Sequence, residues 1–213
     1  MYVPAHFAPP DDESVRDLLR NHGAADLVTS TADGLVATLL PFVYDEPATE
    51  GDRGRLLGHV ARNNDQWRLP ALGEALVIVR GPDAYVSPAW YATKREHGRV
   101  VPTWNYVTAH VHGRLVVHDD PAWVEALVRR LTAKHEGRRE EPWSVDDAPA
   151  RFVAGQLRAI VGLEVEITRV EAKWKLSQNR SADDVAGTVT GLEQGSDPAA
   201  HQVAAAMRSA ADH

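Results

Sequence analysis

The sequence contains no cysteine, and this absence excludes disulfide bonds, thiolate metal sites and a cysteine nucleophile. Basic residues are outnumbered: 23 Lys and Arg against 30 Asp and Glu give a formal net charge of -7, which offers no global attraction to nucleic acid or an anionic membrane. The apolar runs are too short to span a bilayer, and the first residues lack the pattern of a secretory signal. We therefore expect a cytoplasmic protein with no membrane segment.

Several catalytic and binding motifs are also missing. The chain has no glycine-rich loop of the dinucleotide or P-loop kind, no GxSxG and no HExxH. His110 and His112 fall on one face of a predicted strand, but no third ligand has the spacing that a zinc site needs. The acidic pair Asp146 and Asp147 is typical of a solvated linker. We expect no metal site and neither of these nucleotide-binding folds.

The composition is that of a folded protein. The 213 residues are 44% hydrophobic, enough for one sizeable domain with its own core. We expect this domain to cover residues 1–195, followed by a helical tail over residues 196–213.

The hydrophobic pattern predicts short strands in the first half and helices between and after the later strands. Ser14 is the expected cap of the first helix, Asn63 or Asn64 that of a short helix after residue 61, and Gly81-Pro82-Asp83 the break between two strands. The predicted strands are 26–31, 35–42, 54–61, 74–81, 84–88, 103–119 and 163–174; the predicted helices are 14–23, 119–137, 149–159, 181–193 and 197–211.

The order of these elements indicates a fold class. Most of the predicted strands are joined by short turns such as Asp33-Gly34, which favours antiparallel pairing. We expect a mainly β protein of the α+β type, in which an antiparallel barrel carries peripheral helices.

Three segments have residue types suited to ligand binding. In GHVARNNDQW (58–67), Arg62 and the amides of a helix start suit an anion, although an ordinary cap has the same appearance. GPDAYVSPAWY (81–91) and VPTWNYVTAHVHG (101–113) crowd aromatic side chains that suit a flat heterocycle, a barrel core or a dimer interface. KWKLSQNR (173–180) suits a solvated turn, or a cradle for a phosphate or for the polar edge of a ring.

Six motifs, in this order, resemble the PaiB-like family of FMN-binding negative transcriptional regulators: MYVPAHF, ATLLPF, GHVARNNDQW, GPDAYVSPAWY, VPTWNYVTAHVHG and KWKLSQNR. The resemblance runs from residue 1 to about residue 193. It implies the FMN-binding split barrel shared with pyridoxamine 5'-phosphate oxidase, a homodimer with two flavin sites at the subunit interface, and repression of protease production and sporulation genes.

The resemblance also implies which residues bind FMN. One edge of the ring would lie along Thr38 and the backbone of Leu39–Phe42, so the contact residues here are Thr38, Leu39, Pro41 and Phe42. His59, Ala61, Arg62 and Asn63 would hold the ribityl and phosphate end. Trp90, Trp104, Asn105 and Tyr106 would come from the partner chain or lie near the ring, and Lys175, Ser177, Gln178 and Arg180 would close the site near the phosphate or the pyrimidine.

Other functions stay open at this stage. A flavin-dependent oxidoreductase would use the same fold and cofactor, because a fold does not determine a function. A DNA-binding repressor has little support, since the chain shows no helix-turn-helix with a basic recognition helix. A barrel that has lost its ligand and serves as a dimeric scaffold is the remaining alternative.

Overall fold

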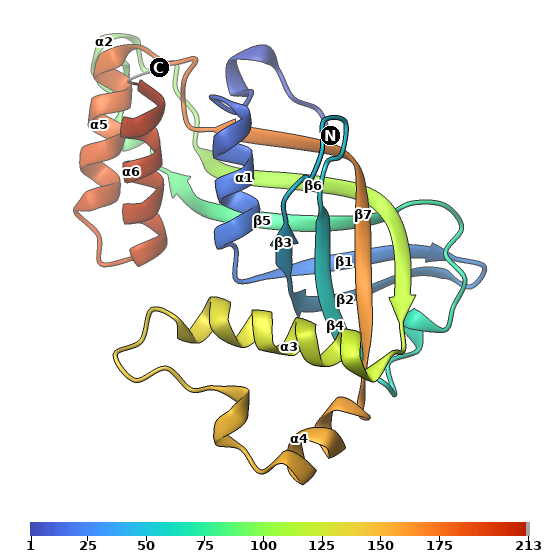
Figure 1. The fold of residues 1–213 in the computed structure, drawn as a ribbon. Helices are drawn as coiled ribbons and strands as arrows, with labels where there is room; N and C mark the ends of the chain where they lie inside the picture. Colours follow the sequence, from blue (N-terminus) through green and yellow to red (C-terminus); the bar gives the residue numbers. More distant parts are fainter. Residues whose placement is uncertain (212–213) are drawn as a thin grey trace. The chain divides into compact units, whose positions relative to one another are not determined.

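A computed structural model of the chain describes residues 1–211. These residues form seven strands: β1 (Ala24–Thr31), β2 (Gly34–Pro41), β3 (Val43–Asp45), β4 (Arg55–Ala61), β5 (Ala75–Val86), β6 (Thr103–His118) and β7 (Ile160–Lys175). The α-helices are α1 (Asp12–Asn21), α2 (Thr93–His97), α3 (Pro121–Glu136), α4 (Ala150–Leu157), α5 (Ala182–Glu193) and α6 (Pro198–Ala211) (Figure 1). Short 3-10 helices are η1 (Ala5–Phe7), η2 (Asp65–Trp67), η3 (Pro88–Trp90) and η4 (Val145–Asp147).

The strands form one sheet in the order β2-β1-β5-β6-β7-β4-β3. β1 pairs antiparallel with β2 and β5, and β4 pairs antiparallel with β3 and β7. Within the described residues the sheet has β2 and β3 at its two edges, so it is not closed. The predicted α+β class with an antiparallel split barrel is therefore confirmed.

The chain divides into two compact units. Unit 1 comprises residues 1–18, 80–109 and 171–213, and unit 2 comprises residues 19–79 and 110–170. The predicted tail over residues 196–213 corresponds to α6 in unit 1, and its last two residues lie outside the described part of the chain. In residues 1–211, every helix is too short or too polar to cross a membrane.

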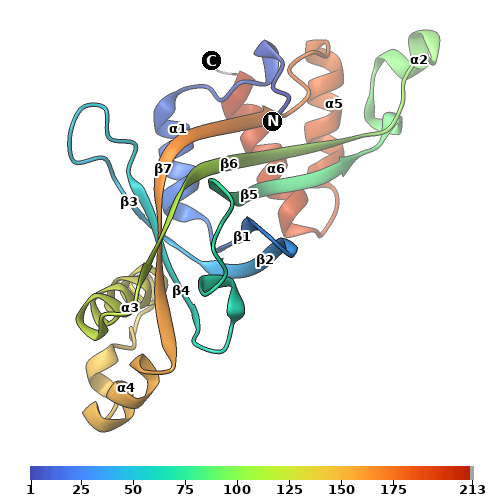
Figure 2. The same cartoon turned by 90° about the vertical axis from the view of Figure 1, so that its right-hand side faces the viewer.

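Unit 2 is built around the hairpin β1–β2 and the helix α3. Gly34 adopts a φ of 117° directly after the tight turn, a conformation that favours glycine over other residues. α3 begins after Asp120, whose carboxylate accepts from two backbone amides, and it packs Leu127 and Leu131 against Val43 and Leu57. In Figure 2, α3 and α4 lie beside the ends of β4 and β7.

Unit 1 contains the helical pair α5 and α6, which lie side by side (Figure 1). Val203, Ala204 and Met207 of α6 are buried, as is Leu192 of α5. The close contact between α5 and η3 depends on a glycine, because a Cβ at Gly191 would lie 2.3 Å from the indole of Trp90. The last helix is thus part of the core of unit 1.

The structure differs from the sequence prediction in three places. β5 runs without a break through Gly81-Pro82-Asp83, where the sequence predicted two strands. The three-residue strand β3 was not predicted at all. α1 begins at Asp12, and Asp11 accepts the hydrogen bond from the backbone amide of Ser14 at 2.6 Å, so Ser14 is not the cap. In contrast, Asn64 caps η2 as predicted, accepting from the backbone amide of Gln66.

Candidate functional site

The 173–180 segment of unit 1 leaves β7 in a turn that its own side chains fix. Ser177 has a φ of 67°, the only positive φ of a residue other than glycine in the described chain. The Gln178 amide accepts from the backbone N–H of Leu176 at 2.8 Å and donates to the carbonyl of Trp174 at 2.6 Å. The structure therefore uses both ends of the Gln178 side chain inside the turn, and a residue held in the left-handed region points to a constrained, functional segment.

A buried pair ties this turn to β6. Asn105 is fully buried and donates from Nδ2 to Ser177 Oγ at 3.0 Å, while the Ser177 hydroxyl lies 3.2 Å from Asn105 Oδ1. The same amide nitrogen lies 3.4 Å from Met207 Sδ. Asn105, Ser177 and Gln178 thus shape the turn with groups that the sequence assigned to FMN.

The lysines of this segment, Lys173 and Lys175, lack partners of opposite charge among the described residues. Lys175 Nζ donates to Thr103 Oγ1 at 2.7 Å and to the carbonyl of Trp104, and both acceptors are neutral. Burial, together with the positive charges of Lys173 and Arg180, lowers the pKa of Lys175. Among the described residues no carboxylate forms an ion pair with either lysine. This part of unit 1 carries excess positive charge beside its backbone turn.

Aromatic rings lie next to these cations. The Tyr106 ring centroid is 5.9 Å from Lys175 Nζ, and the Arg180 guanidinium lies 4.8 Å from the centroid of Tyr91. Tyr91 is almost fully buried, and burial raises the pKa of its hydroxyl. Tyr91 was not among the predicted binding residues, although its place in GPDAYVSPAWY could have indicated it.

The two predicted tryptophans have different surroundings. Trp90 packs its indole on Gly191 of α5 and is half-buried. Trp104 is exposed on β6, donates from Nε1 to Asp83 at 2.9 Å and lies edge-on to Tyr85. Trp90 therefore serves helix packing in unit 1, and Trp104 is the more accessible ring.

In unit 2, the predicted ring-edge residues lie along β2. Leu39 is 65% exposed, Phe42 is fully buried, and Pro41 is intermediate. Thr38 accepts from Nδ2 of Asn64 at 3.0 Å, which links β2 to η2. Through Asn64, the structure brings Thr38 next to the start of η2, as the assignment of both segments to one ligand requires. The sequence analysis considered Asn64 only as a helix cap.

The guanidinium of Arg62 already donates hydrogen bonds to several protein groups. Its Nη1 donates to Asp119 at 2.9 Å, its Nη2 contacts the other oxygen of that carboxylate, and its Nε donates to the carbonyl of Arg158 at 2.8 Å. A further bond reaches the carbonyl of Ile160 at 3.2 Å. The pairing raises the pKa of Arg62 and lowers that of Asp119. A phosphate at this position would have to displace Asp119.

The other residues assigned to the phosphate end differ in accessibility. Ala61 and Asn63 are exposed. His59 is partly buried, and its buried Nδ1 has no hydrogen-bond partner within residues 1–211. Burial lowers the pKa of His59, so the imidazole is neutral near pH 7. The amide of Asn63 and Nδ1 of His59 are therefore more available to a ligand than the guanidinium of Arg62.

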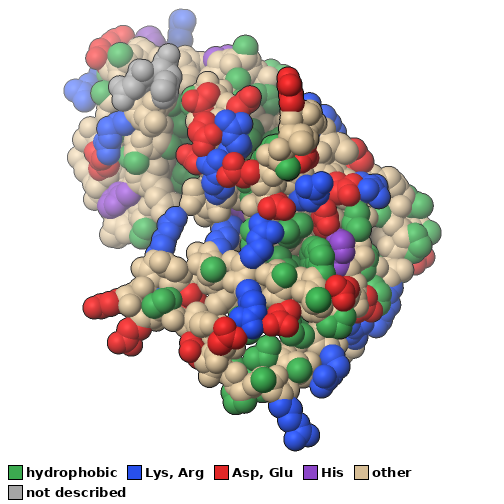
Figure 3. All heavy atoms as spheres, viewed as in Figure 1, with side chains coloured by type: hydrophobic (Ala, Val, Ile, Leu, Met, Phe, Trp, Pro, Cys, Tyr) green, Lys and Arg blue, Asp and Glu red, His purple; other side chains and the backbone are tan. Residues whose placement is uncertain are grey.

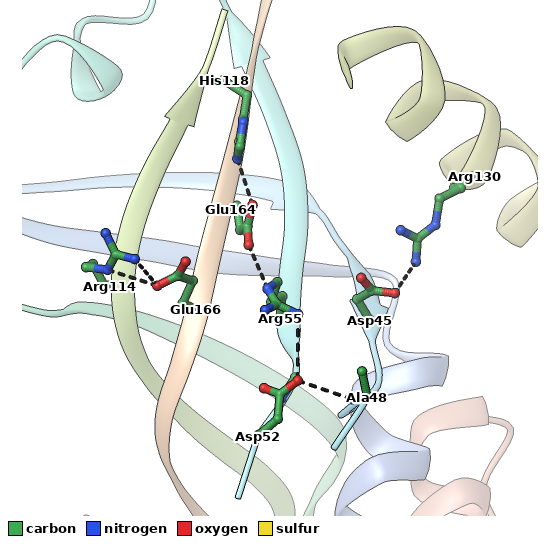
Figure 4. A network of polar contacts seen from close by, with 10 residues as sticks. Asp45, Ala48, Asp52, Arg55, Arg114, His118, Arg130, Glu164 and Glu166 are labelled. Carbon is green, nitrogen blue, oxygen red and sulfur yellow. Dashed lines mark hydrogen bonds and ion pairs between the residues drawn. The ribbon is translucent and has the colours of Figure 1, made fainter. Parts of the chain in front are cut away.

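A polar network in unit 2 escaped sequence reasoning. Glu164 of β7 lies between His118 Nε2 at 2.7 Å and Arg55 Nε at 2.9 Å (Figure 4). The His118 ring stacks on Trp123 with centroids 4.0 Å apart. The sequence places these side chains on predicted strands. Which strands pair, and in which register, appears only in the structure. The network cross-links three strands, and nothing in its geometry requires a ligand.

Comparison with known proteins places the chain in a family. Residues 1–169 match the family described as "Putative FMN-binding domain". The chain belongs to this family. It is 31% identical to the "Protease synthase and sporulation protein PAI 2" of Bacillus subtilis over 208 residues, covering 97% of this chain and 96% of that protein. The resemblance to the PaiB-like family and the expectation of FMN as its cofactor are therefore confirmed at the level of the family.

Solved structures support the fold. The flavocytochrome Anf3 from Azotobacter vinelandii aligns with a TM-score of 0.55 at 17% identity, covering 87% of this chain and 78% of that one. The FAD- and heme-binding protein from Mycobacterium smegmatis aligns with a TM-score of 0.52 at 18% identity, covering 84% and 78%. At these identities the likeness concerns the fold alone.

Proposed function

We propose that the protein is a cytoplasmic FMN-binding homodimer of the PaiB type. The observation that carries this proposal is the rigid 173–180 turn, which holds Lys175 and Arg180 beside the rings of Tyr106 and Tyr91 in a member of an FMN-binding family. FMN combines a dianionic phosphate, a polar chain and a flat tricycle. Ammonium and guanidinium groups suit the first, and aromatic faces suit the last.

The residues of this chain would bind and orient FMN, which supplies a redox-active ring when bound. Lys175 keeps two neutral acceptors, so its ammonium is positioned while its charge is left for an anion. Ser177 and Gln178 contribute by fixing the turn from within. In unit 2, the Thr38–Asn64 pair and the half-buried His59 would supply neutral polar contacts.

The visible absorption spectrum tests the cofactor. The purified protein is measured before and after FMN is added and excess removed by desalting, and we expect a retained flavin band. Lys175→Met should reduce flavin retention, whereas Lys94→Met, at an exposed lysine of the same unit, should not. A protein that retains no flavin under either condition would contradict the proposal.

The homodimer is proposed from the edge strand β2. Leu35 and Leu39 are 77% and 65% exposed and, four positions apart, lie on the same face of β2. Exposed leucines on an unprotected edge strand are a liability in a monomer, and a second copy of the chain would cover them. Light scattering should give a dimer for the native chain, and the double variant Leu35→Glu, Leu39→Glu should shift it to a monomer.

A regulatory role of the PaiB type rests on the similarity to the Bacillus relative alone. Direct contact with DNA is not part of the proposal. Acidic and basic side chains are interspersed on the face shown in Figure 3, and the net charge is -7. A DNA-binding surface would instead give an affinity that falls steeply with salt. We therefore expect no salt-dependent shift of a DNA fragment in a binding assay. A separate assay of NAD(P)H oxidation by the flavin-loaded protein distinguishes an oxidoreductase from a sensor.

A further inference from the structure

Lys173 is a lysine of β7 whose positive charge is not paired within the described part of the chain. Only 8% of the residue is exposed, and its ammonium group takes part in no hydrogen bond or ion pair with the described residues. A largely buried lysine without a carboxylate partner keeps its charge available for an anion. The family resemblance did not assign Lys173 to FMN.

Three aromatic rings surround the Lys173 ammonium. The ring centroids of Tyr2, Phe7 and Tyr106 lie 5.6, 5.6 and 5.5 Å from its Nζ. Ring faces attract a cation at this range, but they leave its charge unneutralised. Phe7 is itself buried, whereas Tyr2 is highly exposed. The N-terminal segment thus covers the lysine from one side.

A second ammonium group shares this environment. Lys175 follows two positions later on the same strand face, and its Nζ lies 5.9 Å from the Tyr106 centroid and 6.0 Å from that of Phe7. The repulsion between the lysines contributes to the lowered pKa of Lys175. A ligand with two negative charges would remove both the repulsion and the unpaired state of Lys173.

The nearest acidic residue on this face of the strand is already engaged. Glu171, two positions before Lys173, pairs with the N-terminal amine of Met1. This contact anchors the segment that carries Tyr2 and Phe7, and it leaves the lysines without a carboxylate from the strand. An anion from outside the chain would balance the charge of the two lysines.

We infer that Lys173 and Lys175, flanked by Tyr2, Phe7 and Tyr106, form a binding site for a phosphate monoester. Lysine ammonium groups are common phosphate ligands, and the rings offer an apolar surface to the organic part of the ester. The phosphate has two possible sources, namely FMN itself or a separate small ester. The first source rests on the proposed function, whereas the second does not.

Two titrations distinguish the sources. The first compares FMN with riboflavin, which lacks the phosphate, on the native protein and on Lys173→Met, a variant that keeps an apolar chain of similar length. If FMN supplies the phosphate, the variant should lose about 10-fold to 100-fold in FMN affinity and almost nothing in riboflavin affinity, as for a charge-assisted bond. The second titrates phenyl phosphate against the purified protein with whatever flavin it retains.

Controls keep the two proposals separable. Lys94→Met removes an exposed lysine of unit 1 and should leave both titrations unchanged. Tyr2→Ala, at an exposed ring, tests the same site without altering a buried residue. If neither flavin binds, the proposed function fails, and phenyl phosphate still tests Lys173. If Lys173→Met is folded and changes neither the FMN-to-riboflavin ratio nor phenyl phosphate binding, the site is refuted.

Discussion

His22 is a buried histidine whose protonation should weaken the fold in mild acid. Only 5% of the residue is exposed, and its Nδ1 lies 2.6 Å from the carbonyl of Leu19. Its Nε2 is buried and has no hydrogen-bond partner in the described part of the chain. The neutral ring therefore donates from Nδ1, and an added proton on Nε2 would find no acceptor. Burial, and next the positive charge of Lys134, lower the pKa of His22 to about 4.

The size of the effect follows from the shift of this pKa. In the unfolded chain His22 titrates near its ordinary value of 6.5, and in the folded chain near 4. Between these values the unfolded state binds more protons, so the free energy of unfolding falls as the pH is lowered through this window. At about 1.4 kcal/mol per pH unit, the full loss is about 3.4 kcal/mol, of which roughly 2.5 kcal/mol is expected by about pH 4.5.

Urea unfolding monitored by tryptophan fluorescence at several pH values measures this loss. The variant His22→Leu removes the titrating group, so its free energy of unfolding should fall less than that of the native protein over the same window. Lys134→Met provides a second test, because removing the neighbouring charge should raise the pKa of His22 and make the loss smaller. Parallel pH curves for all three proteins would refute the reasoning.

Three further changes test the packing and charge pairs of unit 2. Glu164→Gln should lower the free energy of unfolding by about 1–2 kcal/mol, because it leaves His118 and Arg55 without their shared carboxylate, and the urea midpoint measures this; an unchanged midpoint would argue against the network. Gly162→Ala should cost about 1–3 kcal/mol and alter the near-ultraviolet circular dichroism, because its Cβ would lie 2.2 Å from the Trp123 ring; a native spectrum would show that the ring yields freely. Arg62→Ala should lower the melting temperature and leave the preference for FMN over riboflavin unchanged, since its partners are protein groups; loss of that preference with a native melting temperature would return the phosphate to Arg62.

Local chemistry explains which elements could be predicted. The first hairpin turn and the Asn64 cap depend on the conformational preferences of one or two residues. Asn64 is one of the two predicted caps, and the turn lies at Ala32-Asp33, one residue before the predicted Asp33-Gly34. The break predicted at Pro82 was wrong because a proline interrupts a strand only where its missing N–H is needed. The pairing of β5 with β1 ends at Ile78, so in the described chain Pro82 faces no β1 residue.

The candidate site shows a different limit. Sequence reveals which residues carry amides, hydroxyls and charges, but not which of these groups the fold has already consumed. Gln178 and Asn105 are suited to a ligand by type, yet the structure uses them to hold a turn and a buried contact. Lys173 shows the reverse, because a lysine on a strand is ordinarily exposed and its burial under aromatic rings depends on the N-terminal segment.

The two anion-suited segments therefore differ in a way that residue types alone conceal. Arg62 has a carboxylate partner in Asp119 and donates to two carbonyls, so its charge is balanced and its geometry is complete without a ligand. Lys173 and Lys175 have aromatic rings and neutral oxygens around them, and the carboxylate closest along the strand is engaged by the N-terminus. A binding site needs unbalanced charge held in a fixed position, and within unit 1 the lysine pair meets both conditions. Candidate cations are thus best compared by the charge that stays unpaired after folding. For this reason we propose the phosphate site at Lys173 and Lys175 and not at Arg62.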